Sequence, residues 1–246
     1  IKLSGSKNAS LPILAASILF DEPVEIKNLP KVKDIETMLD LIKSLGFSIK
    51  KNKIKNSVII KKKRIKTFAS YSLVKTMRAG ILVLGPLISK YKKATTSLPG
   101  GCLIGARPVN FHLNALGKLG MTHSIKKGYI YANAHKGLKG SIIKFPKISV
   151  GATENAILAA TLAKGKTILK NCAIEPEIKI DLTNFLNKAG AKIKWIGKRS
   201  VEIDGVKKLN SISHSVMADR IECGTFCVVA AISKGCLLYT SPSPRD

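Results

Sequence analysis

The sequence has few aromatic and few acidic side chains. Aromatic residues make up 5% of the 246 residues, and 15 Asp and Glu stand against 42 Lys and Arg, for a net charge of +27. Nucleic-acid-binding proteins gather such charge on one face and add aromatic groups that stack on bases. Here only six basic residues are arginine, and the lysines are spread along the chain. We therefore predict no nucleic-acid partner, although a basic nucleic-acid-binding protein stays the alternative from another functional class.

The sequence also lacks long apolar runs and paired cysteines. The longest apolar run, at 79–88, is far shorter than the roughly 20 residues of a membrane-spanning helix, so no membrane partner is predicted. The five cysteines are odd in number and contain no CxxC pair, which argues against a disulfide framework. Cys223 and Cys227 have no histidine nearby, so no metal site is predicted. This cysteine usage favours a reducing compartment, and we expect a cytoplasmic protein.

A repeat of about seventy residues is the strongest structural signal in the sequence. Each unit has a polar start, an apolar helix, a strand, a second helix that ends in glycine, and a closing pair of strands. The helix-ending glycines are Gly46, Gly120 and Gly190, at a position where a left-handed backbone is common. The helices are expected at 11–19, 34–45, 74–88, 109–119, 153–163 and 180–189. The strands are expected at 24–28, 48–51, 57–61, 94–98, 122–126, 129–133, 167–171, 192–196 and 200–203.

The three βαβαββ-like units indicate one α/β domain, which we place at 7–215. Such units cannot bury their apolar faces alone and must pack on one another. A fourth unit starts at 216–236, and we assign it to a second domain together with a strand at 1–6. Residues 237–246, LLYTSPSPRD, follow neither a helical nor a strand period and are interpreted as a non-native tail. We therefore expect the chain to be a truncated piece of a two-domain protein.

The stretch LPGGCLIGARPVNFH at 98–112 is a loop with chemically active side chains. Its three glycines release the backbone on both sides of Cys102, which allows the thiol to move toward a substrate. Arg107 lies five residues later, and a nearby cation favours the thiolate and binds phosphate or carboxylate. The alternative is a glycine-rich turn in which Cys102 is a small hydrophobic residue.

Cations precede three of the expected apolar helices. Lys7, Lys147 and Arg220 lie at the starts of the helices of the first, third and fourth units. A cation there opposes the helix dipole unless an anion is bound. We therefore predict that these helix N-termini converge on one anionic ligand. For each residue taken alone, the alternative is an exposed side chain in a lysine-rich protein.

Further candidates lie in or beside the same elements. Arg78 lies in an apolar segment, where it should be paired or face a ligand, and a surface arginine is its alternative. Ser149 and the amides of Val150 and Gly151 could hold a diphosphate, although a capping turn also explains the serine. His112 is a weaker candidate, because a core-edge histidine explains it as well.

Four stretches of the chain resemble the enolpyruvyl transferases that act on UDP-N-acetylglucosamine. They are GSKNASLPILAA at 5–16, the loop at 98–112, KISVGATEN at 147–155 and ADRIECGTF at 218–226. The resemblance implies that the repeated units form an inside-out α/β barrel, with helices inside and sheets outside. It also implies that the full enzyme has two such domains.

The resemblance implies roles for residues at matching positions. Lys7 and Asn8 match a phosphoenolpyruvate-binding pair, and Cys102 matches the catalytic cysteine, which acts as a proton donor. We predict Cys102, Arg107 and Lys7 as the catalytic group. The predicted substrate-binding set is Lys7, Asn8, Arg78, Arg107, Pro108, Val109, Asn110, Phe111, His112, Lys147, Ile148, Ser149, Val150, Gly151 and Arg220. The sequence departs from the family at Asn110 and Phe111, where Asp-Leu is usual, and at Leu103, where alanine is common.

The implied activity is transfer of enolpyruvate from phosphoenolpyruvate to the 3-hydroxyl of UDP-N-acetylglucosamine, the first committed step of peptidoglycan synthesis. These two substrates are the implied partners, and no metal or organic cofactor is implied. The sibling alternative is 3-phosphoshikimate 1-carboxyvinyltransferase, which the Cys102 loop and the KISVG stretch argue against. In the family a catalytic aspartate and a further arginine belong to the second domain. Residues 1–246 alone are therefore expected to be inactive.

We predict that Cys102 is the most reactive of the five thiols. It lies between glycines and near Arg107, whereas the other cysteines fall in helix- or strand-like stretches. In the intact enzyme it should be the first thiol alkylated by fosfomycin, an epoxide phosphonate that inhibits the resembled family. Mass spectrometry after treatment locates the adduct, and earlier modification of Cys172 or Cys223 would contradict the assignment.

Overall fold

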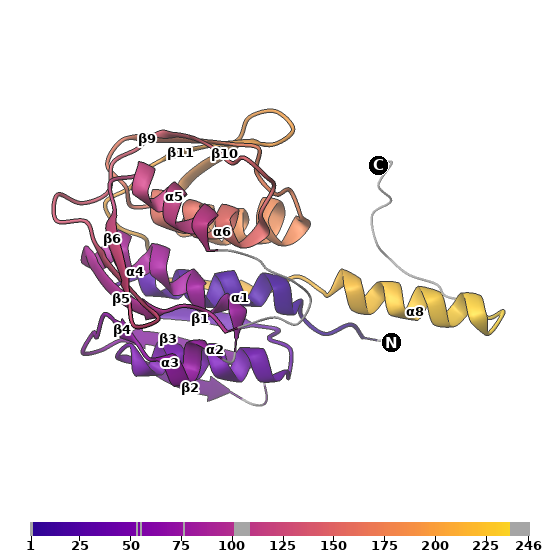
Figure 1. Ribbon diagram of the computed structural model, residues 1–246. Helices are drawn as coiled ribbons and strands as arrows, with labels where there is room; N and C mark the ends of the chain where they lie inside the picture. Colours follow the sequence, from indigo (N-terminus) through magenta and orange to yellow (C-terminus); the bar gives the residue numbers. More distant parts are fainter. Residues whose placement is uncertain (1, 53, 55, 76, 101–108, 237–246) are drawn as a thin grey trace.

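Three apolar helices form the interior of the protein. A computed structural model describes residues 2–52, 54, 56–75, 77–100 and 109–236. Each of the three units supplies one of these helices: α1 (Lys7–Ala16), α4 (Leu84–Tyr91) and α6 (Val150–Ala160). Most of their side chains are buried, and the strands lie outside them (Figure 1). This arrangement confirms the expected inside-out α/β barrel.

Three four-stranded sheets cover these helices, and they share one topology. The first has the order β12 (Ile212–Ser215), β1 (Val24–Lys27), β3 (Ser57–Lys62) and β2 (Phe47–Asn52). The second has the order β4 (Phe68–Ala69), β5 (Lys93–Ser97), β7 (Tyr129–Asn133) and β6 (Thr122–Lys126). The third has the order β8 (Ile142–Lys144), β9 (Lys166–Lys170), β11 (Ser200–Asp204) and β10 (Lys192–Trp195).

The first strand of each sheet was absent from the expected set. β12, β4 and β8 each pair in parallel with the neighbouring strand, whereas the other pairings in the sheets are antiparallel. These three strands have two to four residues, so they carry too little alternation to be recognised locally. Each one comes from the connection that precedes or follows a unit. They therefore join one unit to the next.

The second helix of each unit ends at the expected glycine. Gly46 follows helix α2 (Lys33–Ser44), Gly120 follows α5 (Asn110–Lys118) and Gly190 follows α7 (Thr183–Lys188). The φ angles of these glycines are 93°, 104° and 101°, in the left-handed region that favours glycine. This confirms the basis of the repeat.

The expected continuous helix at 74–88 is wrong. The chain instead forms α3 (Tyr71–Val74), the 3-10 helix η2 (Arg78–Val83) and then α4. Two backbone donors that would continue an α-helix are missing, because Pro86 has no N–H and Gly85 donates its N–H to the side chain of Asn155. Two further short helices are η1 (Ser17–Leu19) and the π-helix η3 (Glu177–Leu182).

The ring of three units is closed by the strand that follows the third unit. β12 pairs in parallel with β1 over four residues, from Val24 with Ile212 to Lys27 with Ser215. Beyond it, the side chain of Asn28 donates a hydrogen bond of 2.9 Å to the carbonyl of Val216. The chain then runs antiparallel to residues 4–6, where Gly5 bridges Ala218. The expected strand at 1–6 is thus a single bridge among the described residues, and its assignment to a second domain stays a prediction.

Helix α8 (Arg220–Ile232) extends away from the barrel (Figure 1). None of its residues is buried, and the side chains of Ile221, Val228, Val229 and Ile232 are exposed. Its assignment to a second domain stays a prediction. Within the described part of the chain, no helix is both long enough and apolar enough to span a bilayer.

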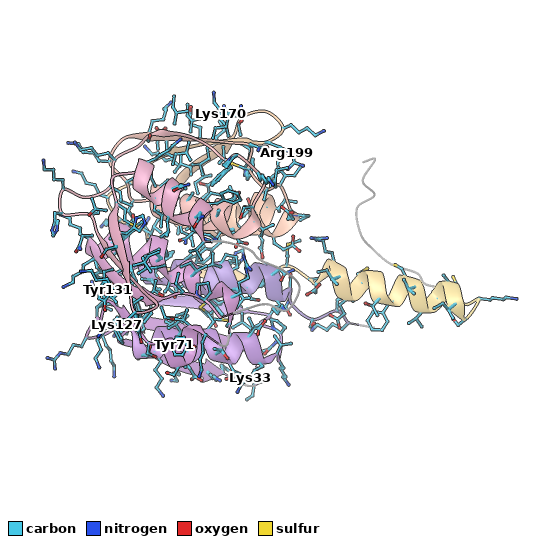
Figure 2. The ribbon with its side chains drawn as sticks, viewed as in Figure 1. Lys33, Tyr71, Lys127, Tyr131, Lys170 and Arg199 are labelled. Carbon is cyan, nitrogen blue, oxygen red and sulfur yellow. The ribbon has the colours of Figure 1, made fainter. Side chains whose placement is uncertain are left out.

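The lysines are dispersed over the surface of the barrel. Side chains project outward all round the body, and the labelled Lys33, Lys127 and Lys170 lie on three different parts of it (Figure 2). Lys61 lies on β3 and Lys62 ends that strand, within the basic run at 61–66. Lys62 forms an ion pair of 2.7 Å with Asp21, so part of the run is neutralised within the fold.

Replacing Gly46 with alanine should destabilise the protein more than replacing Gly120. Both substitutions force a left-handed backbone on alanine, at a cost of about 1–2 kcal/mol. An added Cβ at Gly46 would also lie 1.8 Å from the carbonyl oxygen of Arg64, whereas at Gly120 the nearest atom is 3.8 Å away. Urea unfolding of residues 1–246 measures both free energies, and equal losses would contradict this packing argument.

Candidate functional site

A large cleft lies where the helix starts of the barrel meet. Its volume is about 1020 Å³, and it is bordered by the first turns of α1 and α6, by η2, by the start of α5 and by Arg220 of α8. Most of the predicted residues that the structure describes line it: Lys7, Asn8, Arg78, Phe111, His112, Lys147, Ile148, Ser149, Val150, Gly151 and Arg220. Residues that are far apart in the sequence therefore share one site.

Two of the predicted residues that the structure describes, Val109 and Asn110, do not line the cleft. Cys102, Arg107 and Pro108 lie outside the described residues, so their roles stay predictions. Gly100 lines the cleft on one side of this segment, and Phe111 and His112 line it on the other.

The first turns of α1 and α6 are suited to an anion. Ser6 caps α1 by accepting a hydrogen bond from the amide of Ala9, and Ser149 caps α6 by accepting one from the amide of Ala152. Neither first turn contains an acidic residue. The remaining first-turn amides have no carbonyl partner within the helix, and the helix dipole adds positive potential. Two such ends, accompanied by Lys7 and Lys147, make the cleft electropositive at this wall.

Helix α8 is tied to the same wall through its cap. The carboxylate of Asp219 accepts hydrogen bonds from the amides of Ile221 and Glu222, and its other oxygen lies 3.3 Å from the amide of Lys7. One side chain therefore joins the starts of α1 and α8. Arg220, the first residue of α8, is held by Glu177 through a bond of 2.9 Å from Nε to Oε1.

Four acidic residues in the cleft were missed by the sequence analysis. They are Asp34, Glu154, Glu175 and Glu177. Asp34 pairs with Lys7 at 3.1 Å, and the second carboxylate oxygens of Glu175 and Glu177 are buried without a hydrogen-bond partner among the described residues. A signal was available, because an EPE motif at 175–177 is unusual in a chain with only 15 acidic residues.

Glu154 is one of the buried acids of the cleft. It is 5% exposed, on α6, one turn after the cap. Burial raises its pKa well above the ordinary value, and the charges of Glu175 and Glu177 raise it further. Its carboxyl group is therefore held in the protonated form over a wider pH range than an exposed glutamate.

His112 is buried and neutral. Burial and the charge of Arg78 lower its pKa to about 4. Its Nδ1 lies 3.1 Å from the side-chain nitrogen of Asn155. The core-edge alternative and the cleft assignment both hold for this residue, since its ring is 5% exposed and also lines the cleft.

Cys172 and Cys223 lack the environment of an activated thiol. Cys172 is buried, which raises its pKa to about 12, and the pKa of Cys223 is raised by desolvation and by Cys227. In the described part of the chain, no three His, Cys, Asp or Glu side chains are placed to hold a metal ion.

Comparison with known proteins shows the family. A family model described as EPSP synthase (3-phosphoshikimate 1-carboxyvinyltransferase) matches residues 1–242. The chain belongs to this family of enolpyruvyl transferases. A solved member, the enolpyruvyl transferase NikO from Streptomyces tendae, has the same fold, with a TM-score of 0.78 at 21% identity over 98% of this chain and 56% of NikO.

Two curated relatives of the chain are UDP-N-acetylglucosamine 1-carboxyvinyltransferases. The protein from Pelagibacter ubique is 61% identical over 245 residues, and that from Aliivibrio fischeri is 50% identical over 236 residues. The matches cover 100% and 96% of this chain, but 58% and 55% of the relatives. The chain thus spans little more than half the length of these enolpyruvyl transferases.

Replacing Glu154 with glutamine should stabilise the protein increasingly as pH rises. Above the pKa of about 4.5 of the unfolded chain, unfolding releases the proton that the folded state keeps, so the wild-type free energy of unfolding falls with pH. The amide does not ionise, so the advantage of Glu154→Gln grows until the raised folded pKa is passed. Thermal unfolding at about pH 5 and about pH 8 measures it.

The matched control is Glu36→Gln, on the exposed side of α2, where Glu36 pairs with Lys51. This surface change should alter the melting temperature little, and by the same amount at both pH values. A pH-independent effect of Glu154→Gln would show that Glu154 is ionised in the folded protein.

Proposed function

We propose that the whole protein transfers enolpyruvate from phosphoenolpyruvate to the 3-hydroxyl of UDP-N-acetylglucosamine, and that this cleft binds both substrates. The observation that carries the proposal is the convergence of Lys7, Arg78, Lys147 and Arg220 with two helix N-termini on one cleft. Both substrates are phosphorylated anions, which such a site favours. The names of the relatives at 61% and 50% identity support the same substrates.

The size of the cleft fits this pair of substrates. Binding sites for small molecules commonly measure about 300–1,000 Å³, and this cleft lies at the upper end of that range at about 1020 Å³. In this proposal the wall formed by Lys147, Ser149 and the α6 amides holds the diphosphate. Lys7 and Asn8, at the start of α1, hold phosphoenolpyruvate.

The proposed chemistry is addition followed by elimination. Protonation of the methylene carbon of phosphoenolpyruvate makes its neighbouring carbon electrophilic, the sugar hydroxyl adds to that carbon, and loss of a proton and phosphate restores the double bond. Cations around the cleft would stabilise the charged intermediate. Cys102 is the proposed acid, and groups of a second domain would complete the site. We propose that this reaction serves peptidoglycan synthesis in the cytoplasm.

Replacing Lys147 with alanine should weaken binding of UDP-N-acetylglucosamine to residues 1–246 by roughly 10- to 100-fold, the loss of one hydrogen bond to a charged group. Lys144→Ala is the matched control, since Lys144 is exposed on β8 and does not line the cleft. Isothermal titration calorimetry measures both variants.

Two outcomes would count against the proposal. Equal affinities of the two variants would place Lys147 outside the binding site. Binding of shikimate 3-phosphate in preference to the UDP-sugar would instead favour the 3-phosphoshikimate branch of the family, whose name the matching family model carries.

A further inference from the structure

A buried amide links α4, η2, α5 and α6 behind the cleft. Asn155, on α6, has no exposed surface. Its Oδ1 accepts a hydrogen bond of 2.7 Å from the amide of Gly85, and its Nδ2 lies 3.0 Å from the carbonyl of Ile81. The same Nδ2 lies 3.1 Å from Nδ1 of His112. The amide thus makes three contacts, to a donor, an acceptor and an imidazole nitrogen.

The backbone partners determine which way this amide is oriented. A backbone N–H only donates, so the atom that faces Gly85 must be the oxygen of Asn155. A backbone carbonyl only accepts, so the atom that faces Ile81 must be the nitrogen. A glycine is required at position 85, because an added Cβ would lie 2.2 Å from Oδ1 of Asn155. The orientation of the amide is therefore fixed independently of His112.

We propose that Asn155 is a positioning residue that holds His112 as a neutral imidazole, with Nδ1 accepting from Asn155 and Nε2–H available to a ligand in the cleft. Nδ2 of Asn155 has two hydrogens, one for Ile81 and one for His112, so Nδ1 must be the unprotonated nitrogen. In the neutral ring the proton then resides on Nε2.

The Nε2 edge of the ring faces the start of α6. A Cβ added at Gly151 would lie 3.1 Å from Cε1 and 3.4 Å from Nε2, and both residues line the cleft. Arg78 is the charge that acts on the ring and disfavours a second proton, and Glu154 and Lys147 line the same cleft. His112 can therefore donate one hydrogen bond to an oxygen of an anionic ligand without adding a charge. This role in binding rests on the proposed function, whereas the tautomer does not.

The tautomer is measured directly by NMR on residues 1–246 labelled with ¹⁵N. The chain has four histidines, and the spectrum of His112→Gln identifies the signals of His112. We expect an unprotonated Nδ1 and a protonated Nε2 in the wild type between about pH 6 and 8. A protonated Nδ1 would overturn the proposal, whatever the ligand affinity.

Asn155→Asp tests the positioning role with an isosteric change. It replaces the donor that faces both Nδ1 and the carbonyl of Ile81 by an acceptor, so the proton should move to Nδ1 or the ring should become charged. Affinity for UDP-N-acetylglucosamine should fall about tenfold, the loss of one hydrogen bond. In the His112→Gln variant, the side-chain amide of glutamine supplies a donor that has no tautomers. Adding Asn155→Asp to that variant should therefore change the affinity for UDP-N-acetylglucosamine little. If Asn155 had only a structural role, the affinity would fall equally with His112 and with glutamine at position 112.

The matched control is Asn187→Asp. Asn187 also donates to and accepts from a backbone, at Ile193, but it lies outside the cleft. It should change neither the His112 signals nor the affinity. If Asn155→Asp does not fold, the wild-type spectrum still decides between the two tautomers. If the wild type has the expected tautomer but binds shikimate 3-phosphate in preference to the UDP-sugar, the proposed function fails and the tautomer set by Asn155 stands.

Discussion

The parallel pairing of β12 with β1 is the constraint on which the rest of the structure depends. Each unit supplies helices that cannot be buried by its own strands, and burial of apolar surface is the main favourable term in folding. Pairing of Val24 with Ile212, and of the residues that follow, brings the end of the third unit to the first and closes the ring around α1, α4 and α6. The same closure places residues 216–219 beside residues 4–6, so that α1 and α8 start together at one cleft.

Closure has an electrostatic consequence. Helix N-termini that would otherwise be separate meet at one wall with Lys7, Lys147 and Arg220, and their potentials add. Acidic side chains neutralise part of this positive charge, since Asp34 forms an ion pair with Lys7 and Glu177 forms one with Arg220. An anionic ligand would compete for the same cations. The free protein thus keeps Lys7 and Arg220 paired with carboxylates in positions that a phosphate can take over.

The buried polar side chains of Glu154, His112 and Asn155, in and behind the wall of the cleft, have a different role. Burial raises the pKa of Glu154 and lowers the pKa of His112, which favours the neutral form of both, and the charges of Glu175 and Glu177 on Glu154 and of Arg78 on His112 act in the same direction. A neutral donor on a buried side chain orients the ligand oxygen that accepts its hydrogen bond, whereas the cations of the cleft attract the anionic ligand. Asn155 fixes that direction because its own orientation is set by the backbone of Gly85 and Ile81.

Local sequence determined the repeat and the glycine helix ends, because cations at helix starts and glycines after helices are short-range signals. Gly46, Gly120 and Gly190 adopt the expected left-handed backbone for that reason. The resemblance of four stretches to a known family indicated the family and most of the cleft residues. Only the tertiary structure decided the parallel strands β4, β8 and β12, because strands of two to four residues carry too little alternation to be recognised locally. It also decided the break of the helix at 74–88, where Gly85 binds a side chain of another unit. The raised pKa of Glu154 and the lowered pKa of His112 depend on desolvation by the assembled ring, a property that no single segment possesses.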